Sequence, residues 1–212
     1  RVELIVPGDA IDGDHHHSGD VCSTNELEQA DIHIELMQEL QTALDGQAGD
    51  TLHYTRGTET HVHEMEEYIG KSLNAVQADD GAYVFDLLKL ETFGTLSWFV
   101  HHGLALGRGK NEGNILRNGL GAVYADAKRD NIRPPDILYS AHVHTPGYDS
   151  YNYREDGLRY KTMHGIISPA WQVKTTYGWK IAALRPNYIG GVYHFIDTDG
   201  RIESPPNFSW TR

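Results

Sequence analysis

The residues best suited to chemistry in this chain are two histidines, His142 and His144, which follow the apolar segment 136–140. That segment is typical of a buried strand, so both imidazoles come just after a strand end. Side chains two residues apart in a regular strand share one face, so the backbone must leave the strand to shape a site here. Neutral imidazole is the commonest metal ligand, and the pair therefore indicates a metal site.

Three further groups of metal-capable residues also follow predicted strands. In α/β sheets, ligands bind beyond the carboxyl ends of the strands, where loops converge. A mixture of Asp and His, with no suitable Cys, suits a pair of Mn, Fe or Zn ions. The groups are Asp9 after strand 2–6, segment 57–61 (GTETH) after strand 51–56, and His101 with His102 after strand 95–100.

Composition narrows the class of protein. A chain of 212 residues is expected to form one domain with a real core. The formal net charge of -12 argues against tight binding of duplex nucleic acid through a broad basic surface. The single Cys22 excludes an internal disulfide and favours a reducing, cytoplasmic compartment. No apolar run approaches the ~18 residues that span a bilayer, so no membrane partner is expected.

Helical and strand patterns alternate over the first two thirds of the chain, and strands dominate after His144. This order predicts an α/β layered domain whose second sheet is built mainly by the C-terminal third. A capping box at 23–26 opens the first helix, whose apolar face comprises Leu27, Ile34, Leu36, Met37, Leu40 and Leu44. The predicted helices are 24–45, 64–78 and 114–130, and the remaining predicted strands are 82–90, 159–167, 178–184 and 190–196, the last before a hairpin turn at 197–200.

The sequences GDAIDG, GTETH, VHHGL and SAHVH resemble, in order and approximate spacing, the motifs of calcineurin-like metallophosphoesterases. Those motifs are D-x-H, G-D-x-x-D, G-N-H-E/D, a strand-end His and G-H-x-H. The resemblance covers about residues 1–145 and implies a four-layer α/β sandwich with two mixed sheets flanked by helices. It implies a single domain, 1–212, in which 146–212 supply the strand-rich second sheet. The segments SPAWQVKT and GGVYHFIDTDG resemble the sequences of bacteriophage-encoded members of the family.

Carried over by position, the resemblance implies a centre of two divalent metal ions. Asp9 would bridge both ions, His142 and His101 would bind the second, and His144 the first. His61 resembles the family histidine that contacts the scissile phosphate and protonates the leaving oxygen. The family Asn is replaced, with Glu59 as the substitute ligand.

Several alternatives stay open at these motifs. Thr58 competes with Glu59 as the substitute ligand, His102 competes with His101, and His63 competes with His61. Ala141 replaces the Gly of G-H-x-H. The D-x-H motif and its strand are expected upstream of Arg1. A further loop is read as solvated and polar, with Asp12 as a second-sphere residue; its members are Asp12, Asp14, His15, His16 and His17.

The expected function is hydrolysis of phosphate esters by a metal-activated hydroxide, with phosphodiesters favoured. The resemblance to phage-encoded members favours a nucleotide or short single-stranded nucleic acid as substrate. It also favours a location in the cytoplasm of a bacterial or phage-infected cell. One alternative is a metal-binding scaffold without catalysis. Another is a different metal-dependent hydrolase, although DGDHHHSGD lacks the H-x-H-x-D-H spacing of a β-lactamase-like enzyme.

Overall fold

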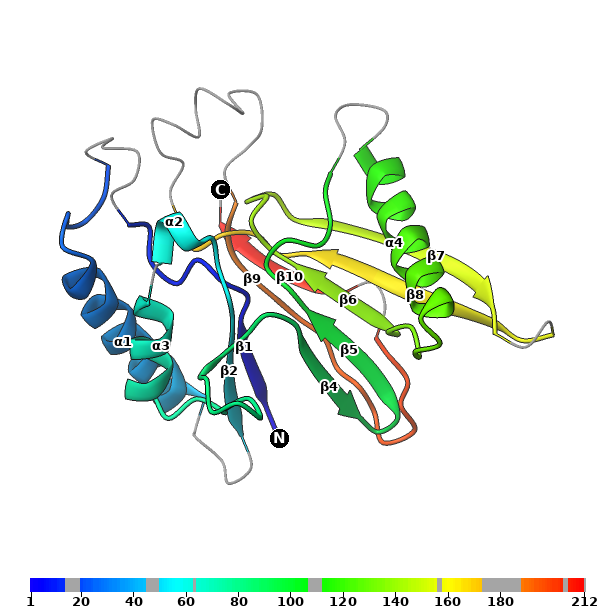
Figure 1. The fold of residues 1–212 in the computed structure, drawn as a ribbon, viewed down its shortest axis with the longest axis horizontal. Coiled ribbons are helices and arrows are strands. Elements are labelled where there is room, and N and C mark those ends of the chain that lie inside the picture. The colour runs from blue at the N-terminus through cyan, green and yellow to red at the C-terminus, as the bar shows by residue number, and fades with distance from the viewer. Residues whose placement is uncertain are drawn as a thin grey trace. The chain divides into compact units, whose positions relative to one another are not determined.

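Helices alternate with strands in the computed structural model, which confirms the α/β class (Figure 1). Within it, the chain separates into two compact units, one formed by described residues up to Leu87 and the other by those from Leu88 onward. The structure describes residues 1–13, 20–44, 50–62, 64–106, 112–155, 158–172, 188–203 and 206–211.

The first unit is built on a parallel sheet in the order β1-β2-β3. Parallel neighbours need a crossover connection, and α1 provides it between β1 and β2. Buried Tyr54, Val62 and Ile69 belong to the core between this sheet and its helices. The elements are β1 (Glu3–Val6), α1 (Glu26–Ala43), β2 (Thr51–Thr55), α2 (Glu59–Val62), α3 (Met65–Ser72) and β3 (Val84–Phe85).

Helix α1 begins at Glu26, two residues after the predicted start, and its N-cap is Asn25 rather than the Ser23 of the predicted capping box; the Asn25 side chain accepts the backbone N–H of Leu27 at 3.0 Å. Of the predicted apolar face only Met37 is buried, together with Gln29 and Ala30. The buried Gln29 amide bonds to the loop after β1, which turns this side of the helix inward. Of the predicted apolar residues, Ile34 is half-buried, whereas four are exposed: Leu27, Leu36, Leu40 and Leu44.

Helix α3 ends at Ser72, six residues before the predicted end at residue 78. Asn74 takes a left-handed backbone, with φ of 52°, and the Ala75 N–H donates to the Gly70 carbonyl at 2.9 Å. This is a common way for a helix to stop. The Val76 N–H then donates to Leu52 of β2, so the chain has rejoined the sheet.

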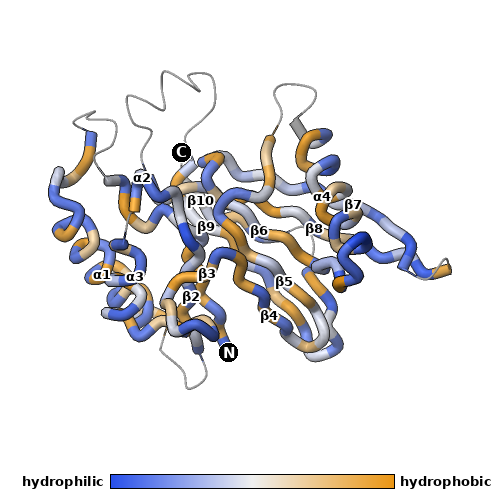
Figure 2. Tube along the Cα trace, viewed as in Figure 1, coloured by the Kyte–Doolittle hydropathy of each residue, from blue (hydrophilic) through white to orange (hydrophobic). Residues whose placement is uncertain are grey.

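The second unit contains a five-stranded sheet in the order β4-β5-β6-β8-β7. Strands β5, β6 and β8 run parallel, and the two outer strands are antiparallel to their neighbours. Helix α4 packs against β7 and β8, and apolar stretches run along the inner strands (Figure 2). The bounds are β4 (Leu88–Thr92), β5 (Thr95–Phe99), α4 (Glu112–Arg129), β6 (Ile137–Ser140), β7 (Gly147–Arg154) and β8 (Tyr160–Ile167).

The second unit also contains a two-stranded antiparallel sheet, formed by β9 (Ile189–Tyr193) and β10 (Asn207–Thr211). The predicted turn at 197–200 is confirmed, with Gly200 at φ of 74° and its N–H on the Asp197 carbonyl at 2.9 Å. The predicted strand 178–184 lies outside the described residues.

Two strand predictions need correction. The predicted strand 82–90 is two strands, because β3 pairs with β2 in the first unit while β4 pairs with β5 in the second. Strand β7, with the sequence GYDSYNYR, was not predicted, since its polar and tyrosine-rich residues lack an apolar alternation. It lies at the edge of the sheet that also holds β4, β5 and β6, so this sheet draws strands from both sides of residue 145.

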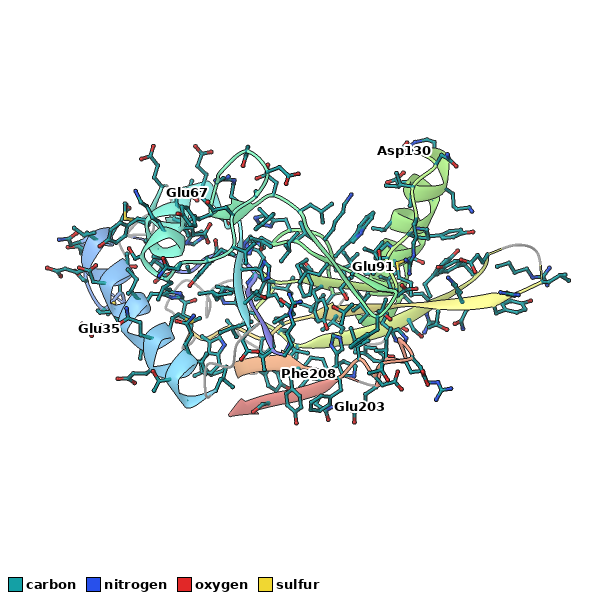
Figure 3. The ribbon with its side chains drawn as sticks, turned by 90° about the horizontal axis from the view of Figure 1, so that it is seen from below. Glu35, Glu67, Glu91, Asp130, Glu203 and Phe208 are labelled. Carbon is teal, nitrogen blue, oxygen red and sulfur yellow. The ribbon has the colours of Figure 1, made fainter. Side chains whose placement is uncertain are left out.

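The negative charge of the chain is spread over separate surfaces. Glu35 on α1, Glu91 on β4 and Asp130 after α4 are all exposed (Figure 3). In the described part of the chain, no helix combines the length and the apolar character needed to cross a membrane.

Candidate metal centre

Asp9 lies in a sharp turn at the carboxyl end of β1. Gly8 and Asp9 have φ values of 84° and 50°, so two consecutive residues are left-handed. This conformation costs a non-glycine residue roughly 1 kcal/mol, although Asp tolerates it better than most. The Asp9 Oδ1 accepts the Thr58 N–H at 2.6 Å, and Thr58 Oγ1 lies 3.5 Å from Oδ2. The predicted bridging carboxylate is thus bonded to the turn that follows β2.

Gly57 allows these two turns to approach each other. A Cβ at this position would lie 2.3 Å from the Asp9 nitrogen and 2.5 Å from its Oδ1. No real side chain fits at such distances, so the requirement for glycine is steric. We call residues 8–10 and 56–58 together the acidic turns.

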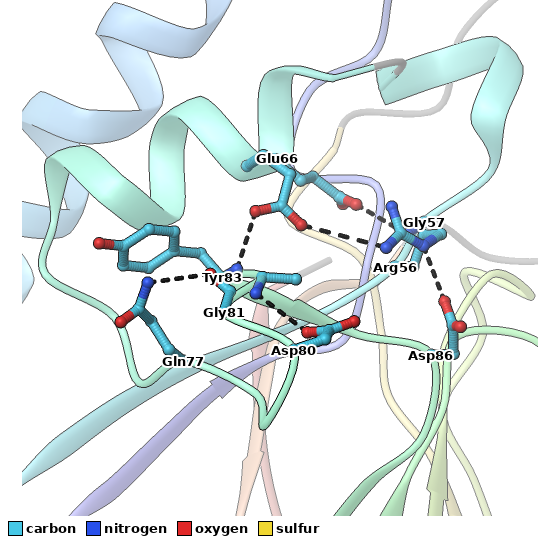
Figure 4. Close-up of polar contacts among 10 residues, drawn as sticks. Arg56, Gly57, Glu66, Gln77, Asp80, Gly81, Tyr83 and Asp86 are labelled. Atoms are coloured by element: carbon cyan, nitrogen blue, oxygen red, sulfur yellow. Dashed lines mark hydrogen bonds and ion pairs between the residues drawn. The ribbon is translucent and has the colours of Figure 1, made fainter.

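The carboxylate of Glu66, on α3, contacts both acidic turns. It is 1% exposed, and its Oε1 accepts the Ala10 N–H at 3.3 Å. Its Oε2 accepts the Gly57 N–H at 2.8 Å (Figure 4). The pKa of the neighbouring Tyr54 is raised by burial and by the negative charge of Glu66. Two carboxylates, Asp9 and Glu66, therefore flank Gly57.

The amide of Gln29 holds the next residues of the loop after β1. Its Oε1 accepts the N–H groups of Asp12 and Gly13, and its Nε2 donates to the Gly13 and Ser23 carbonyls. Asp12 in turn accepts the Nδ1–H of His61 through its carbonyl oxygen, at 2.9 Å. A carbonyl can only accept, so neutral His61 carries its proton on Nδ1 and presents a lone pair at Nε2.

The other predicted residues of the first unit have different surroundings. Glu59 is the exposed first residue of α2, whereas its competitor Thr58 contacts the Asp9 carboxylate. His63, Asp14 and His15 to His17 lie outside the described residues. The roles of Glu59 and His61 stay predictions.

In the second unit, three histidines come together at the carboxyl ends of the neighbouring parallel strands β5 and β6. One nitrogen from each of His101, His102 and His142 lies within 4.8 Å of the others. Their ring centroids are 4.4, 5.2 and 4.2 Å apart in pairs. His101 is 2% exposed, while His102 and His142 are exposed. The alternatives His101 and His102 therefore lie in the same cluster.

The turn after β6 is shaped by two left-handed histidines. His142 and His144 have φ values of 64° and 56°, so the backbone leaves the strand as the sequence predicts. Such strain in non-glycine residues concentrates at functional sites. The left-handed positions follow Ala141, which is not itself left-handed, so no glycine is required there. His144 is exposed and is not one of the three clustered histidines within the described residues.

Ser140 holds the turns of the histidine cluster, residues 101–104 and 141–144, which we call the histidine turns. Its hydroxyl accepts the N–H groups of Gly103 and Leu104 at 3.0 and 3.1 Å and donates to the His101 carbonyl at 3.1 Å. The Ala141 N–H donates to the same carbonyl at 3.1 Å. His101 is thereby fixed to the end of β6.

No family model matches this chain, and no curated protein matches it. A search of solved structures finds a crystal structure of wild-type Vps29 complexed with Zn²⁺ from Entamoeba histolytica. It is 14% identical, the match covers 80% of this chain and 88% of that one, and the TM-score is 0.35.

The donor set itself fits a divalent transition-metal ion. Three imidazoles suit zinc, with nitrogen ligands at about 2.1 Å and therefore about 3.4 Å from one another in a tetrahedron. Nitrogens within 4.8 Å of one another need only a small approach to reach that spacing. The His101 carbonyl is bonded to Ser140 and Ala141 at the end of β6; His102 is the residue after His101, and His142 is the residue after Ala141. The cluster could therefore bind a divalent metal ion.

Sequence reasoning missed three residues that hold these turns: Gln29, Glu66 and Ser140. Ser140 was assigned to the strand before the histidines but not to the site. Gln29 and Glu66 belong to helices whose apolar periodicity gives no sign of a role in the turns.

Proposed function

We propose that this chain is a divalent-metal-dependent phosphoesterase that hydrolyses phosphodiesters. The observation that carries the proposal is the histidine cluster at the carboxyl ends of two parallel strands. In an α/β sheet this is where ligands bind. Left-handed backbone at three of the five proposed ligands, Asp9, His142 and His144, supports it, because such strain persists at functional sites.

The residues are assigned as the motif resemblance implies. His101 and His142 hold one ion, with His102 as a further ligand from the cluster. In the first unit, Asp9 is a metal ligand, Glu59 or Thr58 replaces the family Asn, and His61 contacts the phosphate. In the second unit, His144 is a metal ligand. When bound, such ions lower the pKa of water and neutralise phosphate charge.

The chain's own groups would position the ester. His61 Nδ1–H is bonded to the Asp12 carbonyl, so only the doubly protonated imidazole, through its Nε2–H, would give a proton to a leaving oxygen and return to the neutral Nδ1–H form. The fixed Asp9–Thr58 bond orients one carboxylate oxygen and leaves the group's charge to face a cation. A nucleotide or a short single-stranded nucleic acid is the proposed substrate class, and the net charge of -12 disfavours duplex binding.

The test is hydrolysis of bis-p-nitrophenyl phosphate with Mn²⁺ by the full-length protein. We expect Asp9→Asn and His142→Ala to lower turnover about 100-fold or more, since each removes a metal ligand. Asp86→Asn and His164→Gln are matched controls, because Asp86 is an exposed strand-end carboxylate and His164 a half-buried histidine of β8. Wild-type turnover in both site variants would refute the proposal.

Metal binding separates the proposal from its main alternative. Calorimetry with Zn²⁺ should show binding that His102→Ala weakens about 10-fold or more, if three imidazoles share the ion. Binding without turnover on any phosphoester would instead favour a non-catalytic metal-binding scaffold. Zinc affinity that is the same in His102→Ala would remove His102 from the ligand set.

A further inference from the structure

Glu66 is a buried acid whose two oxygens contact two separate loops. Its Oε1 accepts from Ala10, the residue after Asp9, and its Oε2 accepts from Gly57, the residue before Thr58. Asp9 and Thr58 are themselves joined by the 2.6 Å bond between a carboxylate and an N–H. Glu66 therefore holds Ala10 and Gly57, which are the chain neighbours of Asp9 and Thr58.

The burial of this carboxylate has a physical explanation. A buried charge is costly unless hydrogen bonds compensate it, and both oxygens accept backbone N–H groups. Glu66 is also in the first turn of α3, where the helix dipole favours a negative charge. Gly57 is the point of closest approach, since a Cβ there would lie 2.9 Å from Oε1 and 2.5 Å from Asp9 Oδ1. The acidic turns are thus built around two neighbouring carboxylates.

We infer that Glu66 is a positioning residue for Asp9, and that its charge raises the affinity of the acidic turns for a divalent cation. This inference rests on the proposed function. Glu66 contacts Asp9's turn through the backbone and acts on the ion through Asp9. Two like charges held close together favour a cation beside them, which is why a neutral isostere would serve less well.

The decisive variant is Glu66→Gln, which keeps the size of the side chain but has only one acceptor oxygen. That oxygen should stay with Gly57, the closer donor, so the Ala10 N–H faces an amide nitrogen and loses its acceptor. Hydrogen exchange measured by NMR should then be about 10-fold faster or more at Ala10 and change less at Gly57. The Mn²⁺ concentration for half-maximal turnover should rise about 10- to 100-fold, with KM for the ester unchanged at saturating Mn²⁺.

Glu67→Gln is the matched control, because Glu67 is the next residue of α3 and also accepts a backbone N–H, from Tyr83 at 2.8 Å. A general loss of helix stability would affect both variants, whereas a shift in Mn²⁺ dependence should occur only in Glu66→Gln. Unchanged exchange at Ala10, or an Mn²⁺ dependence equal to that of Glu67→Gln, would overturn the inference.

Two further measurements keep the outcomes separate. If wild-type protein shows no turnover, the proposed function fails, and Mn²⁺ affinity by calorimetry together with Ala10 exchange still decides the role of Glu66. If Glu66→Gln does not fold, Glu66→Asp replaces it, because Asp keeps the charge but withdraws both oxygens by one methylene. Faster Ala10 exchange and weaker Mn²⁺ binding are again expected, and wild-type values of both would contradict the inference.

Discussion

The acidic turns of the first unit and the histidine turns of the second are held by different chemistry. In the first, a charged carboxylate from helix α3 accepts one N–H from each turn. In the second, the neutral Ser140 hydroxyl of β6 accepts two N–H groups and donates to one carbonyl. Both groups are buried, Glu66 at 1% and Ser140 at 0% exposure.

The choice of a carboxylate in one case and a hydroxyl in the other follows from the side chains that the turns carry, an Asp in the first and histidines in the second. Asp9 is an anion, and a second anion beside it is stable when a cation is near, so a charged group there adds to cation affinity. Imidazoles must be neutral to bind a metal, and a neighbouring carboxylate would favour their protonated form. A hydroxyl holds the backbone without that effect. The side chain that holds the acidic turns is thus a carboxylate, and the one that holds the histidine turns is a neutral hydroxyl.

The largest expected effect comes from Gly57→Ala, which tests whether the acidic turns depend on close approach. The added Cβ would lie 2.3 Å from the Asp9 nitrogen, so the turn must move. Displacement of a site group by ~1 Å typically lowers turnover about 100-fold. Bis-p-nitrophenyl phosphate hydrolysis measures it.

Gly119→Ala is the control for that substitution, because its Cβ in α4 would meet only a Leu104 methyl at 3.4 Å. It should turn over at the wild-type rate. Equal activity in Gly57→Ala and Gly119→Ala would mean that Asp9 need not be held where the structure places it.

Acid should destabilise both units in a similar way, through one half-buried histidine in each. Burial lowers the pKa of His33 to about 4 and that of His194 to about 4, against 6.5 in the unfolded chain. Between pH 6.5 and 4 the unfolded state binds more protons than the native state. Stability is therefore full above pH 6.5, falls as pH decreases, and loses at most about 3 kcal/mol per histidine below pH 4.

Urea unfolding at pH 7.5 and 4.5 measures this loss. His33 bonds to Tyr54 and His194 to Tyr139, so Gln at either position keeps a polar partner for the phenol while removing the titration. Each variant should lose less stability between the two pH values than wild type. A pH dependence unchanged by His33→Gln and His194→Gln would show that other groups control the acid response.

The sequence was sufficient to place the candidate site at strand ends. Strands β1, β2, β5 and β6 were predicted within two residues at each end, because each is a short run rich in apolar, aromatic and β-branched residues. The positions of Asp9, His101 and His142 follow directly, since each comes after such a run. The α/β class follows from the same alternation of strand and helix.

The residues that hold the turns could not be predicted, because their partners are remote in the chain. Glu66 bonds to Ala10 across 56 residues, and Ser140 bonds to Gly103 across 37. Local spacing contains no information on such pairs. The error on α1 has the same origin: Gln29 is buried by its bonds to Asp12 and Gly13, and this turns Leu36, 60% exposed, toward solvent.

The smallest expected effect tests the neutral half of the comparison, through Ser140→Ala. The N–H groups of Gly103 and Leu104 would lose a shared acceptor next to the buried end of β6, at a cost of about 2 kcal/mol in the free energy of unfolding. Zinc affinity should fall with it, because the His101 carbonyl loses a donor. Urea unfolding and calorimetry measure the two effects.

Ser72→Ala is the control, since that exposed hydroxyl bonds to Tyr68 within α3, and its loss should change stability by less than about 0.5 kcal/mol. If Ser140→Ala were equally harmless, the histidine turns would be held by the strand ladder alone. The contrast with Glu66 would then be between a turn that needs a buried polar group and one that does not. If Ser140→Ala lowers the free energy of unfolding but leaves zinc affinity unchanged, the hydroxyl contributes to stability and not to the geometry of the site.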